Sequence, residues 1–260
     1  MQSGRDVRTE SCGDDASERW ADASMSAGSV VIGCFRDPAG GALVAGDVIV
    51  VVDVVRTTTT AVTAVAQGRR CFTAPTVAAA RRRAARLERP LLAGEIDDVV
   101  PARFESSNGP AAIAARSDVE RPLVLVSSSG TPLIHAAAAS GTVYLGSLRN
   151  ARYLGLWLAG RHARVAIVAA ANRGEFCEED RVCCALVAGE LLDADYTPED
   201  HATAALVRRW RGASPDAYLR SSGQLADLDF ILAHRDDLPD VFRLDYGEVI
   251  TVPAGVALPA

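Results

Sequence analysis

The chain has 260 residues, 49% of them hydrophobic, and it carries a formal net charge of −6. All 27 of its basic residues are arginines, and the acidic balance argues against a nucleic-acid-binding protein, which usually presents a basic face. Because no apolar run approaches the ~20 residues of a membrane-spanning helix, we expect neither nucleic acid nor a membrane as a partner.

Residues 1–27 are polar and mixed in charge, without the apolar segment of a signal peptide. We predict a disordered tail there, because such a segment has too little apolar surface to bury. The six cysteines and four histidines do not have the spacing of a zinc site. Free thiols are typical of a reducing compartment, and the expected location is the cytoplasm.

After the tail, apolar β-branched runs alternate with alanine-rich helical runs. The predicted strands are Val30–Cys34, Val48–Val52, Cys71–Ala74, Leu91–Ala93, Leu123–Ser127, Val143–Gly146 and Arg164–Ala169. The predicted helices are Thr58–Gln67, Val77–Leu87, Pro132–Ala139, Asn150–Ala159, Glu179–Leu192, Pro198–Arg211 and Pro215–Arg220. This alternation is typical of an α/β fold with a mostly parallel sheet and helices on both faces.

The end of the chain has a different pattern. The short runs Val241–Leu244 and Glu248–Val252 flank Asp245-Tyr246-Gly247, which predicts a hairpin at an antiparallel edge of the sheet. We expect residues 28–260 to form one domain. A two-lobed body, with a helical second lobe beginning near Glu178, stays open as an alternative because no change of composition marks a boundary.

The strongest chemical signal lies where the run Val48–Val52 ends. Asp53 follows it, then Arg56, and four threonines, Thr57 to Thr60, open the next helix. Ligands of open α/β sheets bind at strand C-terminal ends. A carboxylate can hold a hard cation, arginine binds phosphate through two parallel hydrogen bonds, and helix N-terminal amides accept anions. The stretch therefore predicts a site for phosphate and a metal ion, with a plain helix cap as the alternative for Asp53.

Three further segments place polar groups at comparable positions. Glu95 follows a predicted strand and is a candidate second metal ligand beside Asp53. Ser127 to Thr131 follows another strand, where backbone amides can form an anion-binding nest or a serine can simply cap the helix. Glu178 to Asp180 opens a helix, where the helix dipole alone favours acidic residues.

Several familiar motifs of phosphate chemistry are missing. The Asp-x-Asp pair of haloacid dehalogenase-type phosphatases would need an aspartate where Val55 stands. No cysteine is followed six residues later by the arginine of cysteine-based phosphatases, and a chain without lysine has no Walker motif. Metal-assisted attack by water is the simplest hydrolytic mechanism that remains.

The segment Asp53 to Thr60 resembles the Asp-Val-Leu-Arg-Ala-Thr-Thr-Thr segment of the 2-phosphosulfolactate phosphatase (ComB) family. Four later segments are similar to that family in order and spacing, and a fifth is a weaker match. They are Ala93-Gly94-Glu95, Phe104 with Asn108-Gly109-Pro110, Ser127 to Thr131, Gly174 to Asp180, and, weaker, Ser221 to Leu225 with Asp229. The resemblance covers roughly Val48 to Val252 and implies a magnesium-dependent phosphomonoester hydrolase with a ComB-like α/β fold.

The resemblance also implies roles for particular residues. Mg²⁺ would be held by some of Asp53, Glu95, Glu179 and Asp180, and the expected catalytic residues are Asp53, Arg56 and Asp180. One of the acidic groups could instead orient or deprotonate the attacking water. Arg56 and the amides near it would neutralise the phosphoryl charge of the transition state. The expected substrate contacts are Arg56, Thr57, Thr58, Thr59, Asn108, Ser128, Ser129, Gly130, Thr131 and Arg173.

The family's eponymous substrate, 2-phosphosulfolactate, is a small anionic phosphomonoester, and hydrolysis would release its alcohol and phosphate. This chain departs from the family pattern at Thr57, at Gly109 in place of serine, and at Ser127 to Ser129 in place of Thr-Thr-Asn. A phosphatase for a sugar or nucleoside phosphate is therefore one alternative. A non-catalytic phosphate-ligand-binding protein is the other, although the acidic matches are all retained. We expect a small-molecule phosphomonoester as partner and a homodimer as the candidate assembly.

Overall fold

The computed structural model describes residues 28–35, 48–172, 175–214 and 225–252, and the statements below concern those residues. The predicted tail, the predicted helix Pro215–Arg220, Arg173 and the segment Ser221 to Gln224 lie outside them. In the described part of the chain, no helix combines the length and apolarity needed to cross a membrane.

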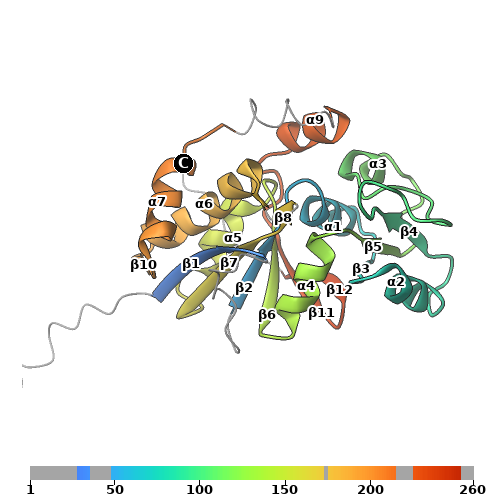
Figure 1. The fold of residues 1–260 in the computed structure, drawn as a ribbon, viewed down its shortest axis with the longest axis horizontal. Helices are drawn as coiled ribbons and strands as arrows, with labels where there is room; N and C mark the ends of the chain where they lie inside the picture. Colours follow the sequence, from blue (N-terminus) through green and yellow to red (C-terminus); the bar gives the residue numbers. More distant parts are fainter. Residues whose placement is uncertain (1–27, 36–47, 173–174, 215–224, 253–260) are drawn as a thin grey trace, which may run out of the picture.

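The strands and helices follow one another along the chain in the alternation that the sequence predicts (Figure 1). The strands are β1 (Gly28–Cys34), β2 (Val48–Val52), β3 (Cys71–Thr73), β4 (Leu91–Gly94), β5 (Leu123–Val126), β6 (Thr142–Gly146), β7 (Arg164–Ala169), β8 (Ala171–Asn172), β9 (Glu175–Phe176), β10 (Tyr196–Pro198), β11 (Val241–Asp245) and β12 (Glu248–Val252). The helices are α1 (Thr57–Ala66), α2 (Val77–Ala84), α3 (Pro110–Ala114), α4 (Gly130–Ala138), α5 (Ala151–Leu158), α6 (Glu178–Asp193), α7 (His201–Trp210) and α9 (Leu225–Ala233).

Ten of the described strands form one sheet in the order β10-β1-β7-β2-β6-β11-β12-β3-β5-β4. The strands from β10 to β6 are parallel to one another, and so are β3, β5 and β4. The hairpin β11–β12 is antiparallel to both groups and joins them. The prediction of an α/β fold with a mostly parallel sheet is confirmed.

The C-terminal hairpin was predicted correctly, but its position at an edge of the sheet was wrong. It lies in the interior, and the edges are β10 and β4. Val241 is buried on one face of the sheet, and Phe242 and Val249 are buried on the other. A strand with apolar side chains on both faces has to be buried on both faces, as in the interior of a sheet. The two runs are too short for the sequence to reveal this pattern.

The sheet curls strongly around α1. Three successive antiparallel pairings make the two parallel groups run in opposite directions. Five strand spacings separate β2 from β5, which is about 24 Å in a flat sheet. Nevertheless the hydroxyl of Thr57, after β2, lies 2.8 Å from the hydroxyl of Ser127, after β5. Helix α1 packs against β3, β5, β6 and β12, and Figure 1 shows it between β2 and β5.

Alternate residues of the central strands supply separate hydrophobic cores. Val50 and Val52 pack with α5, α6 and α7, whereas Ile49 and Val51 pack with α1 and α4. This follows from the two-residue period of a strand, which sends successive side chains to opposite faces. Both faces of the sheet are therefore covered by helices, as the sequence predicts.

Several elements in the second half of the chain differ from the predictions. The helix predicted to start at Pro198 begins at His201, because Asp200 accepts a hydrogen bond from the Thr203 amide at 2.6 Å and caps it. The residues before it, Tyr196–Pro198, form the edge strand β10 instead. Helix α9 was not predicted, although Leu225, Leu228 and Ile231 have helical spacing.

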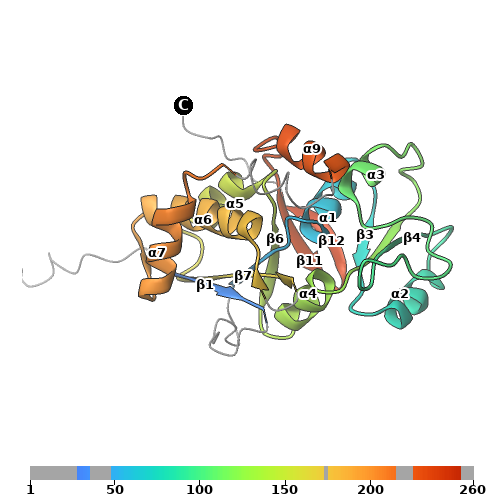
Figure 2. The ribbon, with the colours of Figure 1, turned by 45° about the horizontal axis from the view of Figure 1, so that its top comes forward.

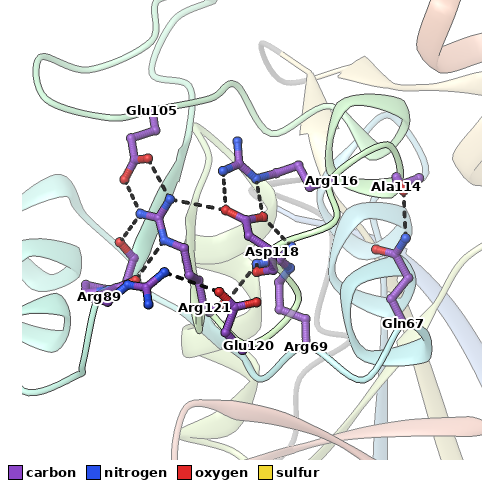
Figure 3. Close-up of polar contacts among 10 residues, drawn as sticks. Gln67, Arg69, Arg89, Glu105, Ala114, Arg116, Asp118, Glu120 and Arg121 are labelled. Atoms are coloured by element: carbon purple, nitrogen blue, oxygen red, sulfur yellow. Dashed lines mark hydrogen bonds and ion pairs between the residues drawn. The ribbon is translucent and has the colours of Figure 1, made fainter.

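A cluster of arginines fastens the end of α1 to the loops beside β4 and β5 (Figure 3). Arg69, 1% exposed, donates to the Asp118 carboxylate at 3.1 Å. Hydrogen bonds from Arg116 and then Arg69 hold the pKa of Asp118 well below its usual range. Arg121 lies between Asp118 and Glu105 and pairs with both. The charged groups of this cluster pair with one another, so we infer that the cluster stabilises the fold.

Candidate active site

The threonine run fixes the turn that carries Asp53. The Thr58 hydroxyl donates to the Asp53 carbonyl at 2.8 Å, and the Asp53 amide donates back to that hydroxyl at 3.1 Å. The hydroxyl of Thr59 donates to the Val54 carbonyl at 2.8 Å, and that of Thr60 to the Asn108 carbonyl at 2.5 Å. These hydroxyls are engaged with backbone, so the run shapes the site from within.

The turn after β5 closes over Asp53. Ser127 accepts hydrogen bonds from the Thr57 hydroxyl at 2.8 Å and from the Thr131 amide at 2.9 Å. A Cβ added to Gly130 would lie 1.9 Å from Oδ2 of Asp53. Glycine is therefore required at position 130, because any side chain would displace the carboxylate.

Glu95 holds the neighbouring loop in place. Its carboxylate accepts hydrogen bonds from the Ser128 amide at 3.1 Å, from the Ser128 hydroxyl at 3.0 Å and from the Asp98 amide at 3.0 Å. Its charge also raises the pKa of Asp53, although less than burial does. The predicted role of Glu95 as a metal ligand stays a prediction.

The first turn of α6 brings two more carboxylates to Asp53. Oδ1 of Asp180 accepts a hydrogen bond from the Val54 amide at 2.8 Å. Burial, and then the charge of Asp53, raises the pKa of Asp180 well above its usual range. Burial, opposed by a backbone hydrogen bond, raises the pKa of Glu179 to about 7, and its Oε2 is buried without a hydrogen-bond partner among the described residues.

The acidic residues form a cluster of oxygen donors rather than a complete metal cage. Burial is also the main cause of the raised pKa of Asp53, so Asp53, Glu179 and Asp180 all resist ionisation in the absence of a cation. Where the chain is described, no group of three histidine, cysteine, aspartate or glutamate side chains is arranged to hold a metal ion. Mg²⁺ commonly binds through one or two carboxylates and keeps several waters, so the donors fit Mg²⁺ better than zinc.

Arg56 stands beside this cluster with few partners. Its side chain is 16% exposed, and its charge lowers the pKa of Asp53 against the effect of burial. Within the described residues its guanidinium makes one ion pair, at 3.8 Å from Nη1 to Oδ2 of Asp227, and the hydrogen bond of Arg56 is to its backbone carbonyl, from the Thr60 amide. The donors of its guanidinium are therefore available to an anionic ligand.

The structure brings together most of the residues that the sequence singled out. Asp53, Arg56, Thr57, Glu95, Ser128, Gly130, Glu179 and Asp180 surround the ends of β2 and β5. The side chains of Thr58, Thr59 and Thr131 bond to backbone, whereas the side chain of Ser129 makes no cap hydrogen bond. Asn108 is buried below α1, and its Oδ1 has no partner in the described part.

Sequence reasoning missed Asp227, the partner of Arg56. It pointed instead to Asp229, which is exposed. The helical spacing of Leu225, Leu228 and Ile231 predicts a buried face for α9, and that signal was available. The contact from α9 to Arg56 was not, because it joins residues 171 positions apart, from Arg56 to Asp227.

Buried carboxylates, a sparsely paired arginine and hydroxyl-rich turns at the strand ends of an α/β sheet are features of an enzyme active site. The sequence model of the family described as 2-phosphosulpholactate phosphatase matches residues 40–254, and the chain belongs to this family. The chain is thus a phosphatase of the phosphoric monoester hydrolase class.

Curated relatives agree with this assignment. The chain is 31% identical over 198 residues to a probable 2-phosphosulfolactate phosphatase of Symbiobacterium thermophilum, covering 75% of this chain and 82% of the relative. It is 34% identical over 192 residues to a protein of the same name from Deinococcus radiodurans, covering 70% and 78%. A third, from Thermus thermophilus, is 34% identical over 170 residues, covering 62% and 69%.

The raised pKa of Glu179 makes a prediction about stability in metal-free buffer. The pKa is about 7 in the folded chain and 4.5 in the unfolded one, so the folded state holds a proton that the unfolded state lacks between these values. The ionisation of Glu179 should therefore lower the free energy of unfolding as pH rises from about 5 to about 7, by up to about 1.4 kcal/mol per pH unit. Urea titrations at several pH values measure this slope.

Two variants isolate the contribution of Glu179. Glu179→Gln should have a distinctly shallower slope over the same pH range, since it has no proton to lose. Glu175→Gln, at an exposed position shortly before α6, should keep the slope of the wild type. Equal slopes for all three proteins would show that Glu179 ionises normally.

Proposed function

We propose that the chain hydrolyses a small anionic phosphomonoester, 2-phosphosulfolactate or a related phosphorylated metabolite, to the alcohol and phosphate with Mg²⁺ as cofactor. The observation that carries this proposal is Arg56, a guanidinium only 16% exposed whose one partner in the described residues is Asp227 at 3.8 Å. Withdrawing such a group from water without hydrogen bonds is unfavourable. A phosphoryl group supplies the two oxygens that would satisfy it. The names of the relatives support the same reaction.

Different residues of the candidate site would have different roles in the reaction. Arg56 would bind two phosphoryl oxygens and neutralise the charge that develops on them. Asp53 and Asp180 would hold Mg²⁺, because both are buried oxygen donors whose like charges oppose each other. When bound, the metal ion supplies positive charge to the phosphoryl group and lowers the pKa of a water.

Glu179 fits the role of general base. Its Oε2 is buried and has no partner in the described part of the chain, and its pKa is about 7. A carboxylate with a pKa near neutrality can accept a proton from an attacking water at physiological pH. Asp180 is less available as a general base, because its Oδ1 already accepts a hydrogen bond from the Val54 amide at 2.8 Å.

Arg56→Lys tests the proposal. Lysine keeps the charge but loses the paired donors, so kcat/KM should fall by ~100-fold, about 2.7 kcal/mol of transition-state stabilisation. The measurement is phosphate release from 2-phosphosulfolactate. Arg81→Lys, at an exposed position on α2, is the matched control and should behave as the wild type. Near-normal turnover of Arg56→Lys would place Arg56 outside the site.

A substrate panel separates the reaction from its alternatives. The hydroxyls of Ser127 and Ser128 form hydrogen bonds within the protein. Few side chains at the positions that depart from the family pattern are therefore free to bind a second anionic group of the substrate. This favours sugar or nucleoside phosphates as competing substrates, and kcat/KM across such a panel ranks them. Binding of phosphate without release from any member would support a non-catalytic protein and contradict the proposal.

We also propose that the enzyme is cytoplasmic. Cys71, Cys183 and Cys184 are buried thiols that form no disulfide. Burial raises the pKa of each of these thiols. Unpaired, unreactive thiols of this kind fit a reducing compartment.

A further inference from the structure

Helix α9 reaches the candidate active site from the far end of the sequence. Leu228 and Ile231 are fully buried in the core that also contains residues of α5 and α6. Figures 1 and 2 both show α9 beside α3, close to the start of α1. The buried face of α9 therefore fixes Asp227, one residue before Leu228, with respect to the turn that carries Arg56.

Asp227 makes two different contacts. Its Oδ1 accepts a hydrogen bond from the Ala111 amide in the first turn of α3 at 3.2 Å. Its Oδ2 lies 3.8 Å from Nη1 of Arg56, and its side chain is 15% exposed. One oxygen thus anchors the carboxylate to backbone, and the other faces the guanidinium.

The distance between Asp227 and Arg56 distinguishes this pair from the other buried arginine pairs. Arg149 donates to Asp237 through two parallel hydrogen bonds of 2.8 and 2.6 Å, which occupy Nε and Nη2. The contact between Arg56 and Asp227 is longer than a hydrogen bond, so it does not use up the N–H donors of the Arg56 guanidinium. Asp227 therefore compensates the charge of Arg56 and restricts its position while its donors stay free for phosphate.

The space for this carboxylate comes from Gly109. A Cβ at that position would lie 2.9 Å from both carboxylate oxygens of Asp227. Because both oxygens lie this close, a side chain at 109 would push the carboxylate away from the Ala111 amide and from Arg56. Gly109 and Asp227 thus form one structural unit.

We propose that Asp227 is the positioning residue for Arg56, and that Gly109 provides the space it needs. The inference rests on the proposed function of Arg56. The carboxylate holds the guanidinium oriented toward the phosphoryl group before substrate binds, so that little side-chain entropy is lost on binding.

A double-mutant cycle tests this role in the full-length enzyme. Asp227→Asn keeps the acceptor for the Ala111 amide but removes the charge, and kcat/KM should fall by ~10-fold. In the Arg56→Lys background the same change should cost less than ~3-fold, because the guanidinium is already gone. Asp227→Glu should recover part of the loss. The inhibition constant of inorganic phosphate should rise in Asp227→Asn, which reports on the site without turnover.

Controls separate positioning from general stability. Asp237→Asn breaks the ordinary pair with Arg149 and should lower Tm, yet leave the phosphate inhibition constant unchanged. If Asp227→Asn does not fold, Gly109→Ala displaces the carboxylate while keeping its charge and should raise that constant as well. Equal losses from Asp227→Asn in both backgrounds would overturn the inference, whereas no effect of Arg56→Lys alone would overturn the proposed function itself.

Discussion

Asp53→Asn should lower kcat/KM by at least ~1000-fold while leaving the fold intact. Asp53 lies where the turns after β2 and β5 meet, against Gly130 and next to the first turn of α6. Asparagine has the same shape and keeps one oxygen acceptor, but it cannot supply the charge that a metal ion requires.

The same variant should be as stable as the wild type at neutral pH, or more stable. Burial raises the pKa of Asp53, and the charge of Glu95 raises it further. The ionised carboxylate therefore destabilises the metal-free fold above its unfolded pKa, and a neutral side chain removes that penalty. Thermal unfolding in EDTA measures this, with Asp245→Asn at the β11–β12 turn as the matched control. A strong loss of Tm, or substantial remaining activity, would contradict the proposed role.

Chelation should abolish phosphate release, and Mg²⁺ should restore it. Burial raises the pKa of Asp53, Glu179 and Asp180, and the charge of Asp53 adds to the raised pKa of the other two, so a cation is the expected counter-charge. Full activity after dialysis against EDTA, in buffer free of metal ions, would rule out this mechanism.

Binding of Mg²⁺ should also be visible without turnover. At a concentration 100 times its Kd, a ligand of the folded state adds about 2.7 kcal/mol to the free energy of unfolding. Mg²⁺ should therefore raise the Tm of the wild type and have a much smaller effect on Asp53→Asn. An equal rise in both proteins would mean that the ion binds elsewhere.

The sequence predicts that the candidate site residues lie together, but the reason for that prediction is only partly right. The sequence places Asp53, Glu95 and Ser127 at the C-terminal ends of predicted strands, where ligands bind in a uniformly parallel sheet. In the structure β2 runs opposite to β4 and β5, and only the curl of the sheet brings their ends together. Strand direction on either side of an inserted hairpin is a long-range property that local periodicity does not contain.

The threonine and serine runs show a second limit of the sequence. A hydroxyl next to a helix start can bind a ligand or bond to nearby backbone, and both uses favour the same residues. Thr58 and Thr59 bond to backbone. The Arg56–Asp227 contact could not be predicted at all, since it depends on how α9 packs.

Because the C-terminal hairpin lies in the interior of the sheet, the sheet can be completed only after residues 241–252 have been synthesised. Strands β11 and β12 are synthesised after every other strand of the sheet, yet they join β6 to β3. While they are still missing, a nascent chain has two separate parallel sheets with exposed inner edges, and such edges invite wrong pairing. At that stage Asp53 and Ser127 would follow strands of two separate sheets whose relative position is not yet fixed. The last strands of the described sheet therefore complete the candidate active site, although none of the site residues named above lies on them.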